Sequence, residues 1–295
     1  MANLQFFIVD VFAEKKYAGN QLAVVLDAGS LLASEMQRLA KEMNYSETTF
    51  ILSRKLVKGG FDVRIFTPDR EIPFAGHPTL GTAFIIQQEV LDQPADQITL
   101  NLGVGQIPVA FRTEEDGTER LWMKQNAPAF GPKIKVATAA LLLGLPAKEV
   151  DDRFPIEQVS TGLPFMIVPL KTLDALKRIH LDAGMYSKLA QKHEAKAILA
   201  FCPETNYRQN QLCARVFAGF YGVPEDPATG SANGCLAGYL VKNQYFGEKR
   251  IDIRVEQGYE IGRPSLLLLK AEERDNSIDV FVGGRVIEVA RGEFL

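Results

Sequence analysis

A loop that leads into a helix, at residues 225–234, holds the residue types best suited to chemistry in this chain. Asp226 is followed by Pro227, which breaks the chain, and then by small residues that include Gly230 and Ser231. The first turn of a helix exposes unpaired N–H groups and a partial positive charge, and small residues leave room there for an anion. Asp226 could hydrogen-bond a substrate or hold a proton. The alternative is that Asp226 and Ser231 only cap the helix, a common role for both residue types.

A second loop of the same kind, at residues 73–83, places His77 directly before Pro78. Proline can occupy the first position of a helix without losing a needed hydrogen bond. An imidazole at a helix N-terminus tends to stay neutral, because the local positive potential disfavours its protonation. His77 could therefore exchange a hydrogen bond with a substrate, or it could simply cap its own helix. The local sequence leaves both interpretations open.

Glu47 lies at the expected start of a strand, between the hydroxyl residues Ser46 and Thr48. A half-buried glutamate beside apolar neighbours can have its pKa raised toward neutrality, which suits a general acid/base. The alternative is an ordinary surface glutamate at the end of a strand, and the local sequence by itself favours that alternative.

The two loops belong to an internal repeat. Shifting the sequence by 151 positions brings the two loops and their flanking strands together without a gap, which predicts two related halves that each offer a helix N-terminus. The coinciding pairs are Phe50 and Phe201, Arg64 and Arg215, Phe66 and Phe217, Pro73 and Pro224, Val104 and Val255, and Gln106 and Gln257.

The elements around these loops are mostly strands. Period-two and β-branched runs predict strands such as 4–12, 22–26, 47–52 and 61–66, and the predicted class is α+β because strands outnumber helices without a βαβ alternation. A helix is expected from Ser34, with Gln37 completing a capping box. Residues 126–133, rich in proline and glycine, are predicted to link the halves, so the first domain is expected at 1–125 and the second from 126.

The bulk composition excludes several classes of function. A net charge of −3 and a pI near 5.8 argue against a nucleic-acid partner. No apolar run approaches the roughly 20 residues of a membrane span, and the first residues lack the basic region of a signal peptide. The cysteines Cys202, Cys213 and Cys235 are too widely spaced for a disulfide framework or a zinc site, which favours a cytoplasmic protein. Without a phosphate-binding loop or nucleophile elbow, a proton-transfer reaction with no metal and no cofactor is expected.

Four segments together resemble the phenazine-biosynthesis isomerase (PhzF-like) family: residues 44–50, 74–83, 226–232, and 257–258 with 262–265. The resemblance covers nearly the whole chain, in order. It implies a diaminopimelate-epimerase-like fold with two pseudo-symmetric domains. Each domain is a twisted, mostly antiparallel sheet wrapped around a central helix, with the active site in the cleft between them. It also implies that the last strand, about 285–295, completes the first domain and leaves 126–284 as the second, and that the protein is a homodimer.

The same resemblance implies roles for particular residues. The family member of phenazine synthesis isomerises trans-2,3-dihydro-3-hydroxyanthranilate without a cofactor, and its catalytic glutamate, proposed to move a proton between ring carbons, corresponds to Glu47. The residues implied at the site are Glu47, His77 and Asp226 as catalytic groups, and Ser231, Gly76, Gly230 and Asn20 as substrate-binding groups.

One departure narrows the chemistry. Related epimerases use a pair of cysteines, and the matching positions here are Ala75 and Asp226. A two-cysteine racemase mechanism is therefore not expected. The leading hypothesis is a cofactor-independent isomerase that shifts a proton on a small carboxylate-bearing substrate. The alternatives are a carboxylate-binding protein without turnover, and a different epimerase or lyase on the same scaffold.

Overall fold

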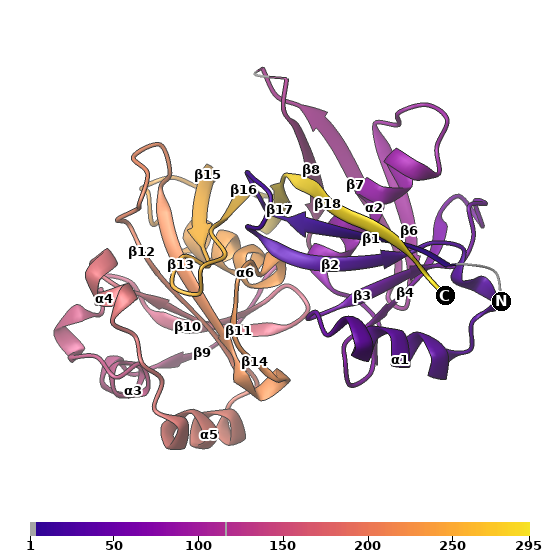
Figure 1. The fold of residues 1–295 in the computed structure, drawn as a ribbon. Helices are drawn as coiled ribbons and strands as arrows, with labels where there is room; N and C mark the ends of the chain where they lie inside the picture. Colours follow the sequence, from indigo (N-terminus) through magenta and orange to yellow (C-terminus); the bar gives the residue numbers. More distant parts are fainter. Residues whose placement is uncertain (1–3, 116) are drawn as a thin grey trace. The chain divides into compact units, whose positions relative to one another are not determined.

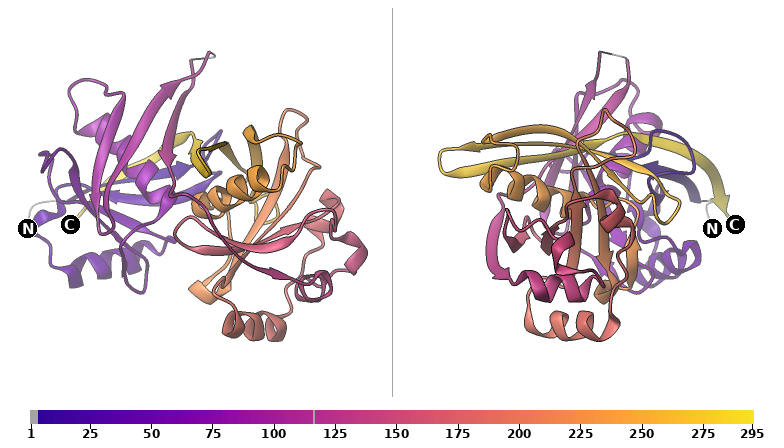
Figure 2. Two further views of the ribbon diagram at one scale, coloured as in Figure 1. Left: turned by 180° about the vertical axis from the view of Figure 1, so that it is seen from behind. Right: turned by 90° about the vertical axis from the view of Figure 1, so that its left-hand side faces the viewer.

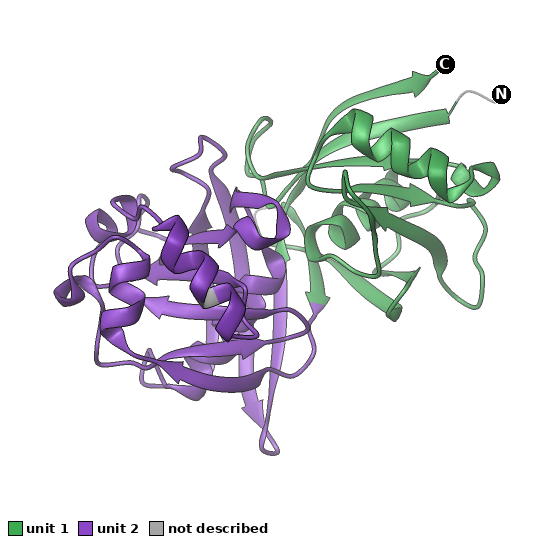
Figure 3. Cartoon of the chain, turned by 90° about the horizontal axis from the view of Figure 1, so that it is seen from below, with its two compact units in different colours: residues 1–123, 283–295 green, residues 124–282 purple. Residues whose placement is uncertain are grey.

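The chain divides into two compact units. A computed structural model describes residues 4–115 and 117–295. Unit 1 comprises Met1–Met123 and Gly283–Leu295, and unit 2 comprises Lys124–Val282 (Figure 3). Sheets with few helices make up both units, so the predicted α+β class is confirmed (Figure 1). Among the residues that the structure describes, none of the helices is long and apolar enough to cross a membrane.

The sheet of unit 1 is mostly antiparallel. Its strands pair in the order β18, β1, β2, β3, β4, β6, β7, β8, with β2–β3 and β4–β6 parallel and β5 paired with β4. The elements of this unit are β1 Leu4–Val11, β2 Asn20–Val25, α1 Ala33–Met43, β3 Thr48–Ile51, β4 Phe61–Phe66, β5 Glu71–Ile72, α2 Gly76–Glu89, β6 Gln97–Leu102, β7 Gly105–Thr113, β8 Glu119–Lys124 and β18 Val286–Phe294.

Unit 2 repeats this pairing order. Its strands pair in the order β9, β10, β11, β12, β13, β15, β16, with β11–β12 and β13–β15 parallel and β14 paired with β13. Its elements, with β17 at their end, are β9 Ala129–Ile134, α3 Val136–Leu142, β10 Ile156–Ser160, β11 Pro164–Pro169, α4 Leu173–Lys177, α5 Ala183–Lys192, β12 Ala197–Cys202, β13 Leu212–Ala218, β14 Val223–Asp226, α6 Gly230–Lys242, β15 Arg250–Gln257, β16 Ser265–Arg274 and β17 Ser277–Gly284. The series from β1 to β7 therefore corresponds to the series from β10 to β16, with α6 in the place of α2.

The ungapped alignment of the two halves is wrong beyond β4. The strands β4 and β13 begin 151 positions apart, at Phe61 and Leu212, but the helices α2 and α6 begin 154 positions apart. Ile65 pairs with Ile72 in unit 1, and its counterpart Val216 pairs with Asp226 in unit 2. Three extra residues therefore lie in the hairpin between β13 and β14, where the second copy forms a short 3₁₀ turn.

A shared packing contact fixes the register after this insertion. A Cβ on Gly103 would lie 3.0 Å from the Cα of Pro73, and a Cβ on Gly258 would lie 3.1 Å from the Cα of Pro227. The counterpart of Pro73 is thus Pro227, not Pro224. The coincidences of Val104 with Val255 and of Gln106 with Gln257 are fortuitous.

The predicted linker is a strand. Residues 129–134 form β9, which pairs antiparallel with β10 and shifts register between Glu157 and Val159. Proline and glycine suggested a linker, but proline is tolerated in a strand whose N–H groups are not all needed, as at a sheet edge or a bulge. Within the described residues β9 pairs only with β10, so Pro132 lies on such an edge.

The prediction of a capping box at Ser34 and Gln37 is also wrong, because other residues form it. The helix begins at Ala33, one residue before the predicted start, and the Glu35 carboxylate accepts a hydrogen bond from the Leu32 N–H at 2.8 Å. The Gln37 amide instead donates to the carbonyls of Thr67 and Pro68 at 2.8 and 3.0 Å. A tertiary contact to the turn after β4 therefore takes the side chain that the local pattern assigned to the cap.

The helices α2 and α6 are the central helices of their units. Each packs against strands of its own unit, α2 against β1 and β2 and α6 against β11 and β16, and Figure 2 shows these ribbons from two further sides. Nearly all residues of both helices are buried, as expected for helices that are apolar on every side. Glycine lets α2 approach its sheet closely, since a Cβ on Gly81 would lie 2.6 Å from the Leu22 side chain. The hydroxyl of Thr82 on α2 also donates to that of Thr49 on β3 at 2.7 Å. This packing fixes the first turn of α2 beside the start of β3.

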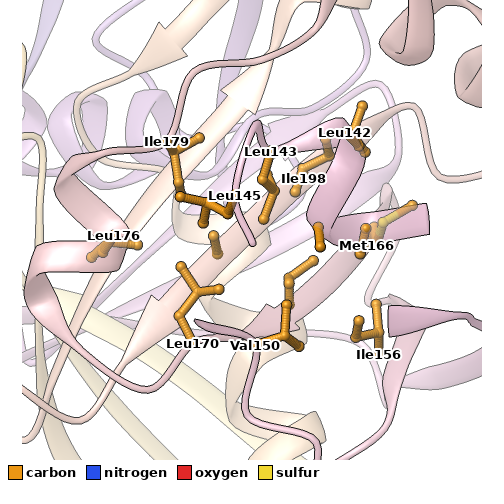
Figure 4. Packing of buried hydrophobic residues seen from close by; sticks show 14 of the residues in the cluster. Leu142, Leu143, Leu145, Val150, Ile156, Met166, Leu170, Leu176, Ile179 and Ile198 are labelled. Carbon is orange, nitrogen blue, oxygen red and sulfur yellow. The ribbon is translucent and has the colours of Figure 1, made fainter. Parts of the chain in front are cut away.

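A second apolar layer lies between each sheet and the outer helices of its unit. In unit 2, residues of α3, α4 and the strands β10 to β13 form one buried cluster that includes Leu142, Leu176, Met166 and Ile198 (Figure 4). In unit 1, Met36 and Ala40 of α1 pack with residues of β2, β3 and β4. The outer helices of both units are thus fixed to their sheets by buried apolar contacts.

Candidate functional site

Glu47 and His77 meet in unit 1. Glu47 directly precedes β3, and His77 is the second residue of α2. His77 Nε2 lies 3.4 Å from Glu47 Oε2, and the two side chains are 7% and 17% exposed. This distance is longer than a well-formed hydrogen bond. The packing of α2 against the start of β3 therefore brings together two residues that are 30 positions apart in the sequence.

His77 is neutral. Burial lowers its pKa to about 3, and a hydrogen bond to the backbone of Gln21 opposes that shift only in part. Within the described residues, Nε2 is buried and takes no hydrogen bond, so we assign the bond to Gln21 to Nδ1–H. This tautomer directs the Nε2 lone pair toward Glu47. A proton carried by Glu47 would find an acceptor there.

Acidification is expected to destabilise the fold through His77. The unfolded ring takes up a proton below pH 6.5, whereas the buried ring resists protonation until about pH 3. Between these values the unfolded state binds more protons, so stability falls as the pH falls. From pH 7 to pH 5 we expect a loss of about 2 kcal/mol in the free energy of unfolding, measured by urea denaturation. The glutamine of His77→Gln cannot be protonated, so the stability loss of this variant between pH 7 and pH 5 should be smaller than that of the parent by about 2 kcal/mol. Equal losses in both proteins would contradict this prediction.

The other predicted residues of unit 1 flank this pair. Asn20 is buried at the start of β2, directly before Gln21, and pairs with Val11 across the strands. The turn before it needs a glycine, because Gly19 has a φ of +69° and a Cβ there would lie 2.3 Å from the Val11 carbonyl. Gly76 is the first residue of α2. The predicted residues of unit 1 thus lie at the starts of three elements: Asn20 at β2, Glu47 just before β3, and Gly76 and His77 at α2.

The other loop lies in unit 2. Asp226 ends β14, and Gly230 and Ser231 are the first two residues of α6. Ser231 occupies the position in α6 that His77 occupies in α2, and both helices begin with glycine. The N-cap residue is Thr229, whose hydroxyl donates to Asp226 Oδ2 and does not cap the helix.

A buried amide network holds this loop against the end of β15. Gln257 Nε2 donates to the Asp226 carbonyl at 2.8 Å and to Thr229 Oγ1 at 3.2 Å. Asn233 Nδ2 in turn donates to Gln257 Oε1 at 2.8 Å and to the Thr229 carbonyl at 3.1 Å. The turn after Gln257 packs on the loop, since Gly258 has a φ of +79° and a Cβ on it would lie 2.5 Å from the Pro227 carbonyl.

Sequence reasoning missed four residues of these two arrangements. They are Gln21 in unit 1, and Thr229, Asn233 and Gln257 in unit 2. The motifs contained three of them, because Thr229 and Asn233 lie in the 225–234 stretch and Gln257 opens the last resembling segment. Nothing in the local pattern of Gln21 indicates its bond to His77.

The cysteines are packed into the core and have no free thiolate. Cys202, Cys213 and Cys235 are all buried. Burial raises the pKa of Cys202 to about 12 and that of Cys235 to about 11. A thiol with such a pKa is a poor acid or base at neutral pH. Within residues 4–115 and 117–295, no three His, Cys, Asp or Glu side chains gather as ligands of a metal ion would. The need for no cofactor stays a prediction.

The family follows from the sequence as a whole. The model of the family described as "Phenazine biosynthesis-like protein" (PhzC-PhzF) matches residues 9–292. The chain belongs to this family. The match includes both loops and Glu47, so the phenazine biosynthesis-like family and the two site arrangements rest on the same residues.

Relatives within the phenazine biosynthesis-like family are isomerases. The trans-2,3-dihydro-3-hydroxyanthranilate isomerase of Pseudomonas aeruginosa is 34% identical over 292 residues, which cover 97% of this chain and 98% of the relative. The enzyme of the same name from Pseudomonas chlororaphis is 36% identical over 293 residues, with the same shares covered. An uncharacterised isomerase of Mesorhizobium japonicum is 31% identical over 309 residues and covers 99% of both chains. This chain is therefore an isomerase of the family.

Solved structures support the fold. The Bacillus anthracis phenazine biosynthesis protein of the PhzF family aligns with a TM-score of 0.92 at 28% identity, covering 100% of both chains. A hydroxyproline epimerase from Agrobacterium vitis aligns with a TM-score of 0.64 at 8% identity, over 100% of this chain and 91% of that one. The second likeness concerns the fold alone, and it confirms the predicted epimerase-like architecture.

Proposed function

We propose that this isomerase shifts a proton on a small carboxylate-bearing substrate, with Glu47 as the general acid/base and without a cofactor. The observation that carries the proposal is the pairing of Glu47 with a neutral His77 at the start of α2, at 3.4 Å. The nearest reaction in kind is the one named for the Pseudomonas relatives, the isomerisation of trans-2,3-dihydro-3-hydroxyanthranilate.

One side chain can perform both halves of such a reaction. The Glu47 carboxylate takes a proton from one carbon of the substrate and returns it to another, so the enzyme ends as it began and no other reagent is consumed. While Glu47 holds the proton, the Nε2 lone pair of His77 accepts its hydrogen bond. A charged imidazolium would instead hold Glu47 as an ion pair, and the low pKa of His77 opposes that.

The proposal also assigns the groups that bind the substrate. Gly76 and Gly230 begin helices of 14 and 13 residues, and the exposed N–H groups of such a first turn favour an anion. We assign Asp226 to hydrogen bonding or proton exchange with the same substrate, and Ser231 and Asn20 to its binding. The proposal includes assembly as a homodimer, which light scattering in solution would check.

Exchange of hydrogen with solvent tests the reaction directly. The protein is incubated in D₂O with trans-2,3-dihydro-3-hydroxyanthranilate and, separately, with other small unsaturated carboxylates, and the products are followed by NMR. We expect an isomer that carries deuterium at the carbon which receives the proton. Neither isomer nor deuterium in any substrate would contradict the proposal. An isomer formed without any deuterium would mean that the carried proton is returned to the substrate before it exchanges with water, and the turnover of Glu47→Gln then tests the role of Glu47.

A further inference from the structure

The hydrogen bonds around Asp226 have only one consistent direction. Asn233 Nδ2 donates to Gln257 Oε1, so the amide nitrogen of Gln257 must face the loop. That nitrogen donates to Thr229 Oγ1 at 3.2 Å and uses a lone pair of the hydroxyl. The single hydroxyl proton of Thr229 is then available to Asp226 Oδ2, which accepts it. Asp226 Oδ2 is thereby held as an acceptor.

Burial makes this order difficult to reverse. Gln257 and Asn233 are fully buried, both with no exposed surface. Turning the Gln257 amide over would place its Oε1 against the Asp226 carbonyl and its Nε2 against Asn233 Nδ2, like against like. A buried polar group that loses its partner is costly, so the network fixes the orientation of the Thr229 hydroxyl.

The fold itself does not need this network. In unit 1 the same strand-to-helix loop is built with Ile72 in the place of Asp226 and Ala75 in the place of Thr229. Neither of these side chains can form the hydrogen bond. The proline and glycine packing that shapes the loop is present in both units. The hydroxyl-to-carboxylate contact is therefore an addition of unit 2 alone.

We propose that Thr229 is a positioning residue of the isomerisation, fixed in turn by Gln257. It orients the Asp226 carboxylate toward the substrate by donating its hydroxyl proton to Oδ2. This inference rests on the proposed function, in which Asp226 acts on the substrate.

Four variants distinguish the positioning role of Thr229 from the role of Asp226 in the proposed function: Thr229→Val, Thr229→Ser, Asp226→Asn, and Asp226→Asn with Thr229→Val. Turnover of trans-2,3-dihydro-3-hydroxyanthranilate is the assay. Thr229→Val keeps the shape and removes the hydroxyl, and we expect kcat to fall about ten- to hundredfold with KM changed less than about threefold. Thr229→Ser keeps the hydroxyl and should restore kcat to within about threefold. In the Asp226→Asn background, Thr229→Val should lower kcat by less than about twofold, because Thr229 acts through Asp226.

Each outcome has a distinct meaning. A low kcat in Asp226→Asn with an unchanged kcat in Thr229→Val would overturn this inference alone, as would fully additive losses. An unchanged kcat in Asp226→Asn would instead overturn the role of Asp226 in the proposed function. Crystal structures of both Thr229 variants give a readout that needs no turnover. We expect the Asp226 carboxylate to rotate in Thr229→Val and to keep its place in Thr229→Ser, and an unmoved carboxylate in both would overturn the inference.

Discussion

Glu47→Gln is expected to lower kcat about a thousandfold, within the range by which a positioned acid/base accelerates proton transfer. The amide has the size of the carboxylate but cannot take a proton from carbon. It can still donate a hydrogen bond toward His77 Nε2, 3.4 Å away in the parent, so the fold should be retained. The measurement is steady-state turnover together with deuterium incorporation, which should be lost to the same degree.

A matched control distinguishes the chemistry from a general loss of charge. Glu42 is an exposed glutamate on α1, and Glu42→Gln removes the same charge from the same unit. We expect its turnover and its thermal unfolding to equal those of the parent. Glu47→Gln should also unfold at a similar temperature and still bind the carboxylate. A kcat within tenfold of the parent would exclude Glu47 as the acid/base.

Arg215→Met is expected to destabilise the protein by about 3–5 kcal/mol, the usual effect of breaking a buried ion pair. The Arg215 side chain is 9% exposed and bonds both oxygens of Glu225 at 2.9 and 2.7 Å. It also donates to the carbonyls of Leu176 and Lys177, the last two residues of α4, and of Ile179 just beyond them. Removing it leaves Glu225 and these carbonyls without their donor. Urea denaturation of the full chain measures the loss.

The repeat supplies the control for this prediction. Arg64 makes the same two-oxygen pair with Glu71 at 2.7 and 2.6 Å, and its guanidinium lies over Phe66 as that of Arg215 lies over Phe217. Arg64 is 29% exposed, and the corresponding pair is partly in solvent. Arg64→Met should therefore cost less than about 1 kcal/mol. Equal losses in the two variants would show that burial does not set the strength of the pair.

The repeat could be predicted because β4 and β13 kept the same residue types. Each strand has an arginine followed two positions later by a phenylalanine, Arg64 and Phe66 in β4 and Arg215 and Phe217 in β13. A fixed offset is enough to align such strands. The offset could not reveal the later insertion, because the 3₁₀ turn at Gly219–Tyr221 changes the length of a surface hairpin and has no pattern of its own. Chance identities beyond it then concealed the shift.

The local features of the candidate site were predictable from the sequence, whereas the tertiary contacts around it were not. The helix starts at Gly76 and Gly230 follow from proline, glycine and an apolar run. The neutral state of His77 was expected from the helix terminus, but its largest cause is burial, which only the packed unit provides. The bonds from Gln257 to the Asp226 loop join residues about 30 positions apart, and no local periodicity encodes them.

The pairing of β18 with β1 has a consequence for synthesis on the ribosome. Leu4 pairs with Phe294, and Phe6 contacts the same aromatic ring, so the first strand of the chain receives its neighbour from the last. Unit 2 is one continuous stretch, Lys124–Val282, and all of it has been translated before that neighbour is made. The unit that contains Glu47 and His77 can therefore be completed only after the whole of unit 2 has been translated.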